Sequence, residues 1–161
     1  MKTQADYAQK GVITHQMKAI ARVEGIDPSV LCQQVAEGSV VIMQRGMRST
    51  GIGRGLRTKI NVNLGTSTGK ADVSEELRKA RIAEEFGADT ISDLSMGGDI
   101  NAIRREIIAH TTLPITTVPV YQAVVENGLE EMTPEDIFAT LRMQAEQGIS
   151  SMVVHCGNRA M

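Results

Sequence analysis

The hydrophobic and polar positions in the second half of the chain predict four short strands. The segments are rich in β-branched and aliphatic residues, and glycine, proline or polar clusters bound them. They cover residues 59–64, 89–95, 115–120 and 151–156. Their starts lie about 30 residues apart, which is the spacing of successive βαβ units. We therefore expect a parallel sheet.

The segments between these strands predict three helices. The first covers residues 72–86, where apolar residues recur every three or four positions. The second begins at Asp99 after two glycines, and the third begins at Thr133, which proline follows. On the third helix we expect the apolar positions to face the core. These positions are Ile137, Phe138, Leu141 and Ala145.

Four strands and three helices in this order predict an α/β fold, specifically a partial (β/α)8 barrel of the TIM type. In the first strand, Asn61 and Asn63 alternate with apolar residues. In a barrel the apolar side would meet the helices and the two amides would face the lumen. A doubly wound open sheet is the alternative, and it usually has a G-x-G-x-x-G turn after its first strand. The turn at residues 65–69 has its glycines at a different spacing, so we favour the barrel.

The N-terminal part of the chain predicts a small, mostly helical region. Thr14 and the pair Asp27-Pro28 are typical of helix starts. Residues 39–43 suggest a short strand, and residues 44–58 are rich in glycine and arginine without periodicity. We interpret the latter as a flexible connection. The expected organisation is thus residues 1–56 for the N-terminal region with its linker, and residues 57–161 for the first half of a barrel.

Composition excludes several classes of function. The net charge is −2 and aromatic residues make up 2% of the chain, so neither phosphate neutralisation nor base stacking favours a nucleic-acid partner. No run of 18 apolar residues and no apolar N-terminal segment occurs, so we expect no membrane partner. Two distant cysteines do not indicate a disulfide scaffold. The expected location is the cytoplasm.

Polar residues collect where a barrel would need them. Barrel enzymes place their chemistry at the carboxyl ends of the strands. An amide there could bind a heterocycle or a ribose, a tyrosine ring could pack on a ligand, and a histidine could move a proton. Each of these residue types also has a structural interpretation: the asparagines, Asp93 and His155 could be bonded to nearby backbone, and Tyr121 could simply pack at the edge of the sheet. The candidates are Asn63, Ser92 with Asp93, Tyr121, and His155 with Cys156.

Catalytic and metal-binding residues are not evident from the sequence. Adjacent residues on a strand point to opposite faces, so His155 and Cys156 do not form a nucleophilic pair. A zinc site needs three or four ligands, and His155 alone does not provide one. We predict no metal site within this chain.

Five segments share a pattern that extends along nearly the whole chain. They are T-Q-x-x-Y-A-x-K-G-x-I-T-x-x-M from residue 3, KINVNLGTS at 59–67, GADTISDLS at 87–95, TVPVYQA at 117–123 and EQGISSMVVHCG at 146–157. In their order and spacing they resemble the phosphomethylpyrimidine synthase family. The resemblance implies a radical S-adenosylmethionine lyase that cleaves carbon–carbon bonds and rearranges aminoimidazole ribotide to hydroxymethylpyrimidine phosphate, the thiamin pyrimidine. It also implies a homodimer, and substrate binding by Asn63, Tyr121 and His155.

The sequence departs from the family pattern at two places. Ser92 stands where methionine is common, and we include Ser92 among the expected substrate-binding residues. A sister group makes 5-hydroxybenzimidazole, a lower base of cobamides, from the same substrate, and that product stays open. The family's cluster ligands form a CxxCxxxxC triplet, which Cys32 and Cys156 cannot supply. S-adenosylmethionine, a 4Fe–4S cluster and zinc are thus expected only for the full-length family.

We interpret the chain as the N-terminal part of such an enzyme, and expect it to be inactive alone. A non-catalytic half-barrel binding module is the competing hypothesis. A half barrel leaves two strand edges unpaired, which favours association.

Overall fold

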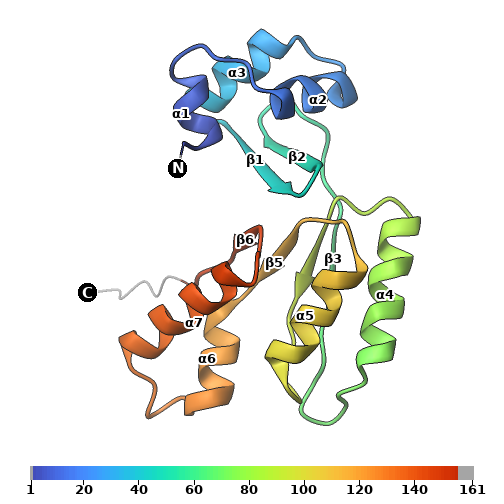
Figure 1. Cartoon of the computed structure of the whole chain (residues 1–161), viewed down its shortest axis with the longest axis vertical. Coiled ribbons are helices and arrows are strands. Elements are labelled where there is room, and N and C mark those ends of the chain that lie inside the picture. The colour runs from blue at the N-terminus through green and yellow to red at the C-terminus, as the bar shows by residue number, and fades with distance from the viewer. Residues whose placement is uncertain (1, 156–161) are drawn as a thin grey trace. The chain divides into compact units, whose positions relative to one another are not determined.

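The computed structural model describes residues 2–155. These residues form two compact units, one that extends to Lys59 and one that begins at Ile60 (Figure 1). Each unit has its own hydrophobic core.

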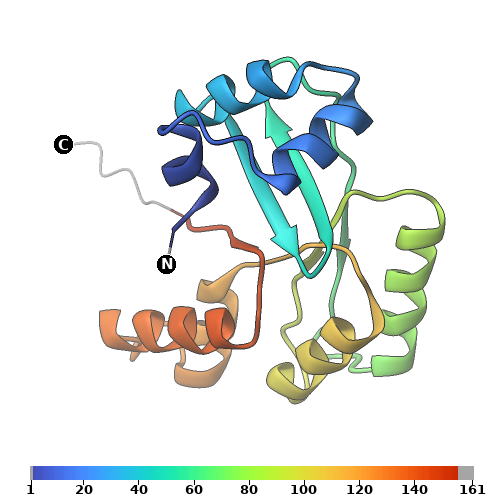
Figure 2. The same cartoon turned by 45° about the horizontal axis from the view of Figure 1, so that its top comes forward.

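The N-terminal unit contains three helices and a β-hairpin. Helices α2 and α3 begin at Thr14 and Asp27, as predicted, and each of these side chains accepts a backbone N–H of the first turn. Helix α2 packs against β2, and α3 packs against β1 (Figure 2). The elements are α1 (Gln4–Ala8), α2 (His15–Glu24), α3 (Pro28–Ala36), β1 (Val40–Arg45) and β2 (Arg48–Gly53).

The prediction of an irregular connection over residues 44–58 is wrong. Arg48–Gly53 forms β2, which pairs antiparallel with β1. The glycines obscured this strand, but Gly51 has a packing role. A Cβ at Gly51 would lie 2.7 Å from Cγ2 of Ile20 on α2, so glycine allows the helix to approach the strand.

In the described residues, the second unit is an α/β fold with a four-stranded parallel sheet in the order β3-β4-β5-β6. This confirms the predicted class and the four strands, and it is consistent with part of a β/α barrel. The elements are β3 (Asn61–Leu64), α4 (Val73–Glu85), β4 (Thr90–Asp93), α5 (Ile100–His110), β5 (Ile115–Thr117), α6 (Pro119–Asn127), α7 (Pro134–Glu146) and β6 (Ser151–Met152).

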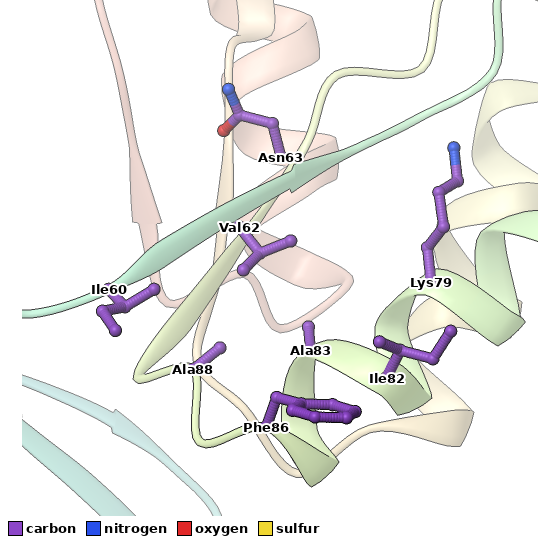
Figure 3. A pocket seen from close by; sticks show the side chains of 8 residues that line it. All are labelled: Ile60, Val62, Asn63, Lys79, Ile82, Ala83, Phe86 and Ala88. Atoms are coloured by element: carbon purple, nitrogen blue, oxygen red, sulfur yellow. The ribbon is translucent and has the colours of Figure 1, made fainter.

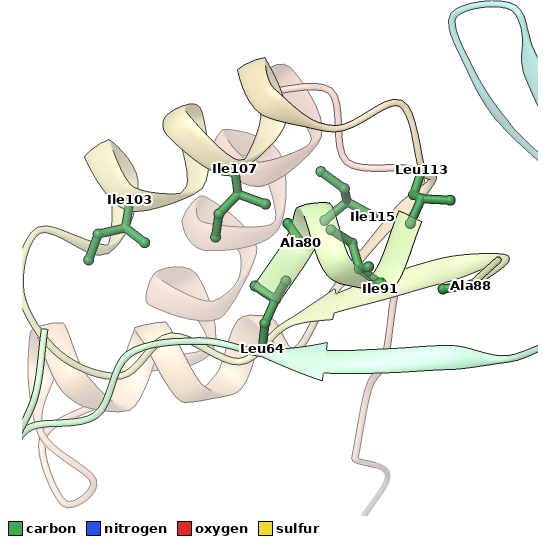
Figure 4. Packing of buried hydrophobic residues seen from close by; sticks show 9 residues of the cluster. Leu64, Ala80, Ala88, Ile91, Ile103, Ile107, Leu113 and Ile115 are labelled. Atoms are coloured by element: carbon green, nitrogen blue, oxygen red, sulfur yellow. The ribbon is translucent and has the colours of Figure 1, made fainter. Parts of the chain in front are cut away.

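Helices α4 and α5 cover one face of this sheet. From α5, Ile103 and Ile107 point toward the strands, where Leu64, Ile91 and Ile115 are buried (Figure 4). Small residues of α4, Ala80 and Ala83, complete the contact. Asp72 and Asp99 cap the two helices, as the sequence predicts. The apolar side of the strands thus meets the helices.

The predicted strand over residues 115–120 is too long. Strand β5 ends at Thr117, and a helix that the sequence analysis missed, α6, begins at Pro119. The valines around Pro119 are typical of strands, but proline has a φ angle that suits the first helical position. Tyr121 therefore lies in the first turn of α6 and not at the end of a strand. Of the predicted strand 151–156, only Ser151–Met152 is assigned as β6, and Cys156 lies outside the described residues.

The two longest helices, α4 and α7, have 13 residues each. At 1.5 Å per residue each is about 20 Å long. In the part of the chain that the structure describes, no helix has the length and apolar character needed to cross a membrane.

Candidate functional site

The face of the sheet opposite α4 and α5 is polar. Asn63 is in register with Ser92, Ser92 with Thr116, and Thr116 with Ser151. Residues in register on parallel strands point to the same side. The row therefore crosses all four strands on one face, and a hydrogen bond of 2.7 Å joins the Thr116 and Ser151 hydroxyls.

Asn61 connects the first two strands of this polar face. Its Nδ2 donates to Oγ of Ser92 at 2.9 Å and to Oδ1 of Asn63 at 3.1 Å. Its Oδ1 accepts hydrogen bonds from the hydroxyls of Thr90 and Ser92. The two amides of β3, Asn61 and Asn63, thus lie together as the alternation predicts. Asn63 is exposed, while Ser92 is buried.

Tyr121 and His155 form the second part of the candidate site. Their ring centroids are 5.8 Å apart and the ring planes differ by 23°, which is within the normal range for stacked aromatic side chains. Tyr121 follows β5 and His155 follows β6, so the stack joins the segments after two adjacent strands. His155 is exposed, which leaves its imidazole accessible to a ligand.

The structure thus groups the four predicted residues into two pairs, Asn63 with Ser92 and Tyr121 with His155. Asn63 and Ser92 each stand one residue before the last residue of their strand, and Tyr121 and His155 follow the ends of theirs, so all four lie toward the carboxyl-terminal side of the parallel sheet. Within residues 2–155, no hydrogen bond or ring contact joins one pair to the other.

The loops that follow β3 and β4 pack tightly against each other. The hydroxyl of Thr66 donates to the carbonyl oxygen of Gly97 at 2.6 Å. A Cβ at Gly97 would lie 2.1 Å from the carbonyl oxygen of Ser67, so only glycine permits this approach. The buried carboxylate of Glu76 on α4 accepts the N–H of Gly65 at 2.6 Å. These contacts hold the edge of the sheet next to Asn63.

Asp93 has a structural role, in agreement with one of its two interpretations. It points to the helix side of the sheet, where its Oδ2 lies 3.1 Å from Nε of Arg104. Its Oδ1 accepts from both the N–H and the hydroxyl of Ser95. The side chains of Asp93 and Arg104 are 0% and 2% exposed. Burial lowers the pKa of Arg104, and the Asp93 carboxylate opposes that shift.

No sequence pattern pointed to Arg104 or Glu76, because a helical pattern does not distinguish a buried charge from an exposed one. The only sequence signal is position, since Arg104 stands four residues after Ile100 in the apolar stripe of α5.

The described residues do not provide a site for a metal or a cluster. Among residues 2–155, no three His, Cys, Asp or Glu side chains come together as possible ligands. Cys32 is buried in the N-terminal unit, with its Sγ 3.9 Å from the carbonyl oxygen of Ala8. The sequence has two cysteines, whereas a 4Fe–4S cluster with one open iron needs three.

The chain is similar to named synthases over nearly its whole length. Residues 3–161 match the family described as the Radical SAM ThiC family. A phosphomethylpyrimidine synthase of Dehalococcoides mccartyi is 43% identical over 96% of this chain. A 5-hydroxybenzimidazole synthase of Geobacter sulfurreducens is 46% identical over 98%, and a phosphomethylpyrimidine synthase of Moorella thermoacetica is 45% identical over 96%. The chain spans 38% of the length of each of these relatives.

Proposed function

Since this chain belongs to the Radical SAM ThiC family, we propose that it forms the substrate-binding N-terminal part of a radical S-adenosylmethionine enzyme. The reaction is a carbon–carbon lyase rearrangement of aminoimidazole ribotide to hydroxymethylpyrimidine phosphate. The observation that carries this proposal is the stack of Tyr121 on the exposed His155, because it brings a packing surface and a hydrogen-bonding ring together beyond two parallel strands.

Each residue has a distinct task in this proposal. The ring of Tyr121 packs on a planar part of the substrate, and the imidazole of His155 hydrogen-bonds to a polar substituent. The exposed amide of Asn63 binds the substrate from β3. Ser92 on β4 contributes its hydroxyl group. These contacts bind and orient the substrate.

The cofactors of the proposed reaction need residues that this chain does not have. Radical chemistry of this type uses S-adenosylmethionine with a 4Fe–4S cluster. The two cysteines of this sequence do not fit such a cluster, so we derive no reaction step through it. We propose that the cluster ligands and a zinc site belong to a part of the enzyme that this chain does not include.

Because of Ser92, we also propose 5-hydroxybenzimidazole as an alternative product. A relative named 5-hydroxybenzimidazole synthase is as similar to this chain as the relatives named phosphomethylpyrimidine synthase. A serine in place of the family's usual methionine leaves more space and offers a hydroxyl at this position. Product analysis by mass spectrometry, with an enzyme that contains this chain, distinguishes the pyrimidine from the benzimidazole.

We further propose that the sheet is the first half of a closed barrel. Strand β3 is at one edge, and beside it Ile60, Ile82 and Phe86 are 56%, 41% and 80% exposed. With Val62, these side chains line an apolar groove of about 300 Å³ between β3 and α4 (Figure 3). The occupant that fits an open strand edge with an adjacent helix is a further βα unit, which the longer relatives have the length to supply.

Alone, the chain should associate through this apolar edge, as the proposed homodimer or as larger assemblies. Light scattering tests this, with Phe86→Lys as the variant and Phe138→Lys, which changes an exposed phenylalanine on α7, as its control. We expect the first change to lower the measured mass and the second to leave it. A monodisperse wild-type monomer would contradict the proposal.

Isothermal titration with aminoimidazole ribotide tests the proposed binding function. We expect Asn63→Ala and His155→Ala each to weaken binding about 3- to 10-fold, the effect of one lost hydrogen bond between neutral groups. The control His110→Ala changes an exposed histidine at the end of α5 and should have no effect. Affinity that neither site variant changes would favour the non-catalytic binding module.

A further inference from the structure

Among the described residues, the side-chain amide of Asn61 makes four hydrogen bonds to neighbouring side chains. Its Oδ1 accepts from the Thr90 hydroxyl at 2.8 Å and from the Ser92 hydroxyl at 3.2 Å. Its Nδ2 donates to Ser92 Oγ at 2.9 Å and to Asn63 Oδ1 at 3.1 Å. Thr90 and Ser92 are both buried, so the oxygen of the Asn61 amide is held from within the sheet.

These contacts select one orientation of the Asn61 amide. With Oδ1 toward Thr90, the hydroxyl proton of this buried threonine has an acceptor. A flipped amide would place its N–H2 group against that hydroxyl, and the hydroxyl proton of Thr90 would lose this acceptor. A buried donor without an acceptor is costly.

The orientation of Asn61 in turn determines that of Asn63. Because Oδ1 of Asn63 accepts from Asn61, the Nδ2 group of Asn63 is directed away from Asn61. Asn63 is exposed, and it points to the opposite side of β3 from Val62 (Figure 3). We infer that Asn61 is a positioning residue, which makes Asn63 present its N–H2 group to an acceptor atom of the bound ligand.

The same arrangement assigns an indirect role to Ser92. Among the described residues, the hydroxyl of Ser92 both donates to and accepts from the Asn61 amide, so in addition to its proposed contact Ser92 acts on a ligand through Asn61 and Asn63. A side chain without a hydroxyl at position 92 would leave Thr90 as the one hydroxyl that holds Asn61. This inference rests on the proposed function for the identity of the ligand, but the orientation of the amides can be tested without a ligand.

The first experiment is side-chain amide NMR of the Asn61→Asp variant of the whole chain, labelled with ¹⁵N. The substituted carboxylate would offer oxygens alone, so the Asn63 amide must rotate and donate its N–H2 group to that carboxylate. We expect the Nδ2–H2 signals of Asn63 to move downfield. In the control Asn127→Asp, the same chemical change is made at the end of α6, and the Asn63 signals should stay in place. Unmoved Asn63 signals in Asn61→Asp would overturn the inference.

The second experiment is titration with aminoimidazole ribotide. Asn61→Asp should weaken binding about as much as Asn63→Ala, roughly 3- to 10-fold. The rotated amide of Asn63 would then present its oxygen, and not its N–H2 group, to the acceptor atom of the ligand. The double variant Asn61→Asp with Asn63→Ala should bind no more weakly than Asn63→Ala alone. Additive losses would overturn the positioning role. If the NMR signals move but the wild-type chain does not bind the ribotide, the amide arrangement stands and the proposed function fails.

Discussion

Replacing Arg104 by methionine should destabilise the second unit, which contains the parallel sheet and is here called the sheet unit, by about 3 kcal/mol. Removal of one partner of a buried ion pair typically costs about 3–5 kcal/mol, because the other charge stays buried without compensation. Here the two side chains are 2% and 0% exposed, and Nε of Arg104 lies 3.1 Å from Oδ2 of Asp93. Oδ1 of Asp93 keeps both hydrogen bonds from Ser95. The expected loss is therefore at the lower end of that range.

A second change separates the loss of a partner from the loss of packing. Asp93→Asn removes the carboxylate charge and keeps an oxygen for Ser95. In the Arg104→Met background it should recover about 2 kcal/mol of the loss, because contacting groups couple by about 0.5–3 kcal/mol. Arg105→Met is the matched control, since Arg105 is the next residue on α5 and is exposed. It should change stability by less than about 0.5 kcal/mol.

Urea unfolding followed by tyrosine fluorescence can measure the free energy of unfolding of the unit that contains Arg104 and Asp93. The chain has no tryptophan and two tyrosines. Tyr7 lies in the N-terminal unit and Tyr121 in the sheet unit. In a Tyr7→Phe background, Tyr121 alone reports on the sheet unit. A loss below about 1 kcal/mol for Arg104→Met, or no recovery on adding Asp93→Asn, would refute this account of the ion pair.

Two further predictions concern single elements. Gly51→Ala should destabilise the N-terminal unit by about 1–3 kcal/mol in thermal unfolding, since the new Cβ would lie 2.7 Å from Ile20 Cγ2. Gly69→Ala, in the second unit, adds a Cβ that meets nothing within 4 Å, and it should leave the thermal unfolding of its own unit almost unchanged. An equal loss of stability in the two variants would contradict the packing role of Gly51. Hydrogen bonds from the hydroxyl and the N–H of Thr133 lower the pKa of Asp136 below its ordinary 3.8. The cap therefore stabilises α7 above pH 3.8 and loses this effect as the pH falls through the lowered pKa of Asp136 in the folded chain. Amide exchange in the first turn of α7 should show the loss. Protection that is unchanged down to about pH 2 would count against it.

The places where prediction failed share a physical cause. The valines of residues 118–125 are typical of strands, but Pro119 begins α6 there. The apolar positions of α7 predict that Phe138 faces the core, yet Phe138 is exposed and Gln144 is buried. Gln144 is held by hydrogen bonds to Thr117 on β5 and to Gln122 on α6. In both segments, contacts with other elements outweigh local propensity.

The sequence by itself determined the elements whose signals are local. Helix starts at Thr14, Asp27, Asp72, Asp99 and Thr133 depend on a side chain that bonds to backbone two or three residues away. The alternation in β3 likewise depends on neighbouring residues, and so it placed Asn61 and Asn63 on one face. The motifs were sufficient to identify the family, because five segments in register are specific without any coordinates.

Only the tertiary structure decided how residues distant in sequence act on one another. Asn61 and Ser92 are 31 residues apart, and Asp93 and Arg104 are 11 apart, and no local pattern shows that either pair is in contact. The stack of Tyr121 on His155 needs β5 and β6 to be adjacent. These interactions depend on the order and register of the strands and not on the propensity of any segment. Strand order and register are established when the sheet packs against its helices.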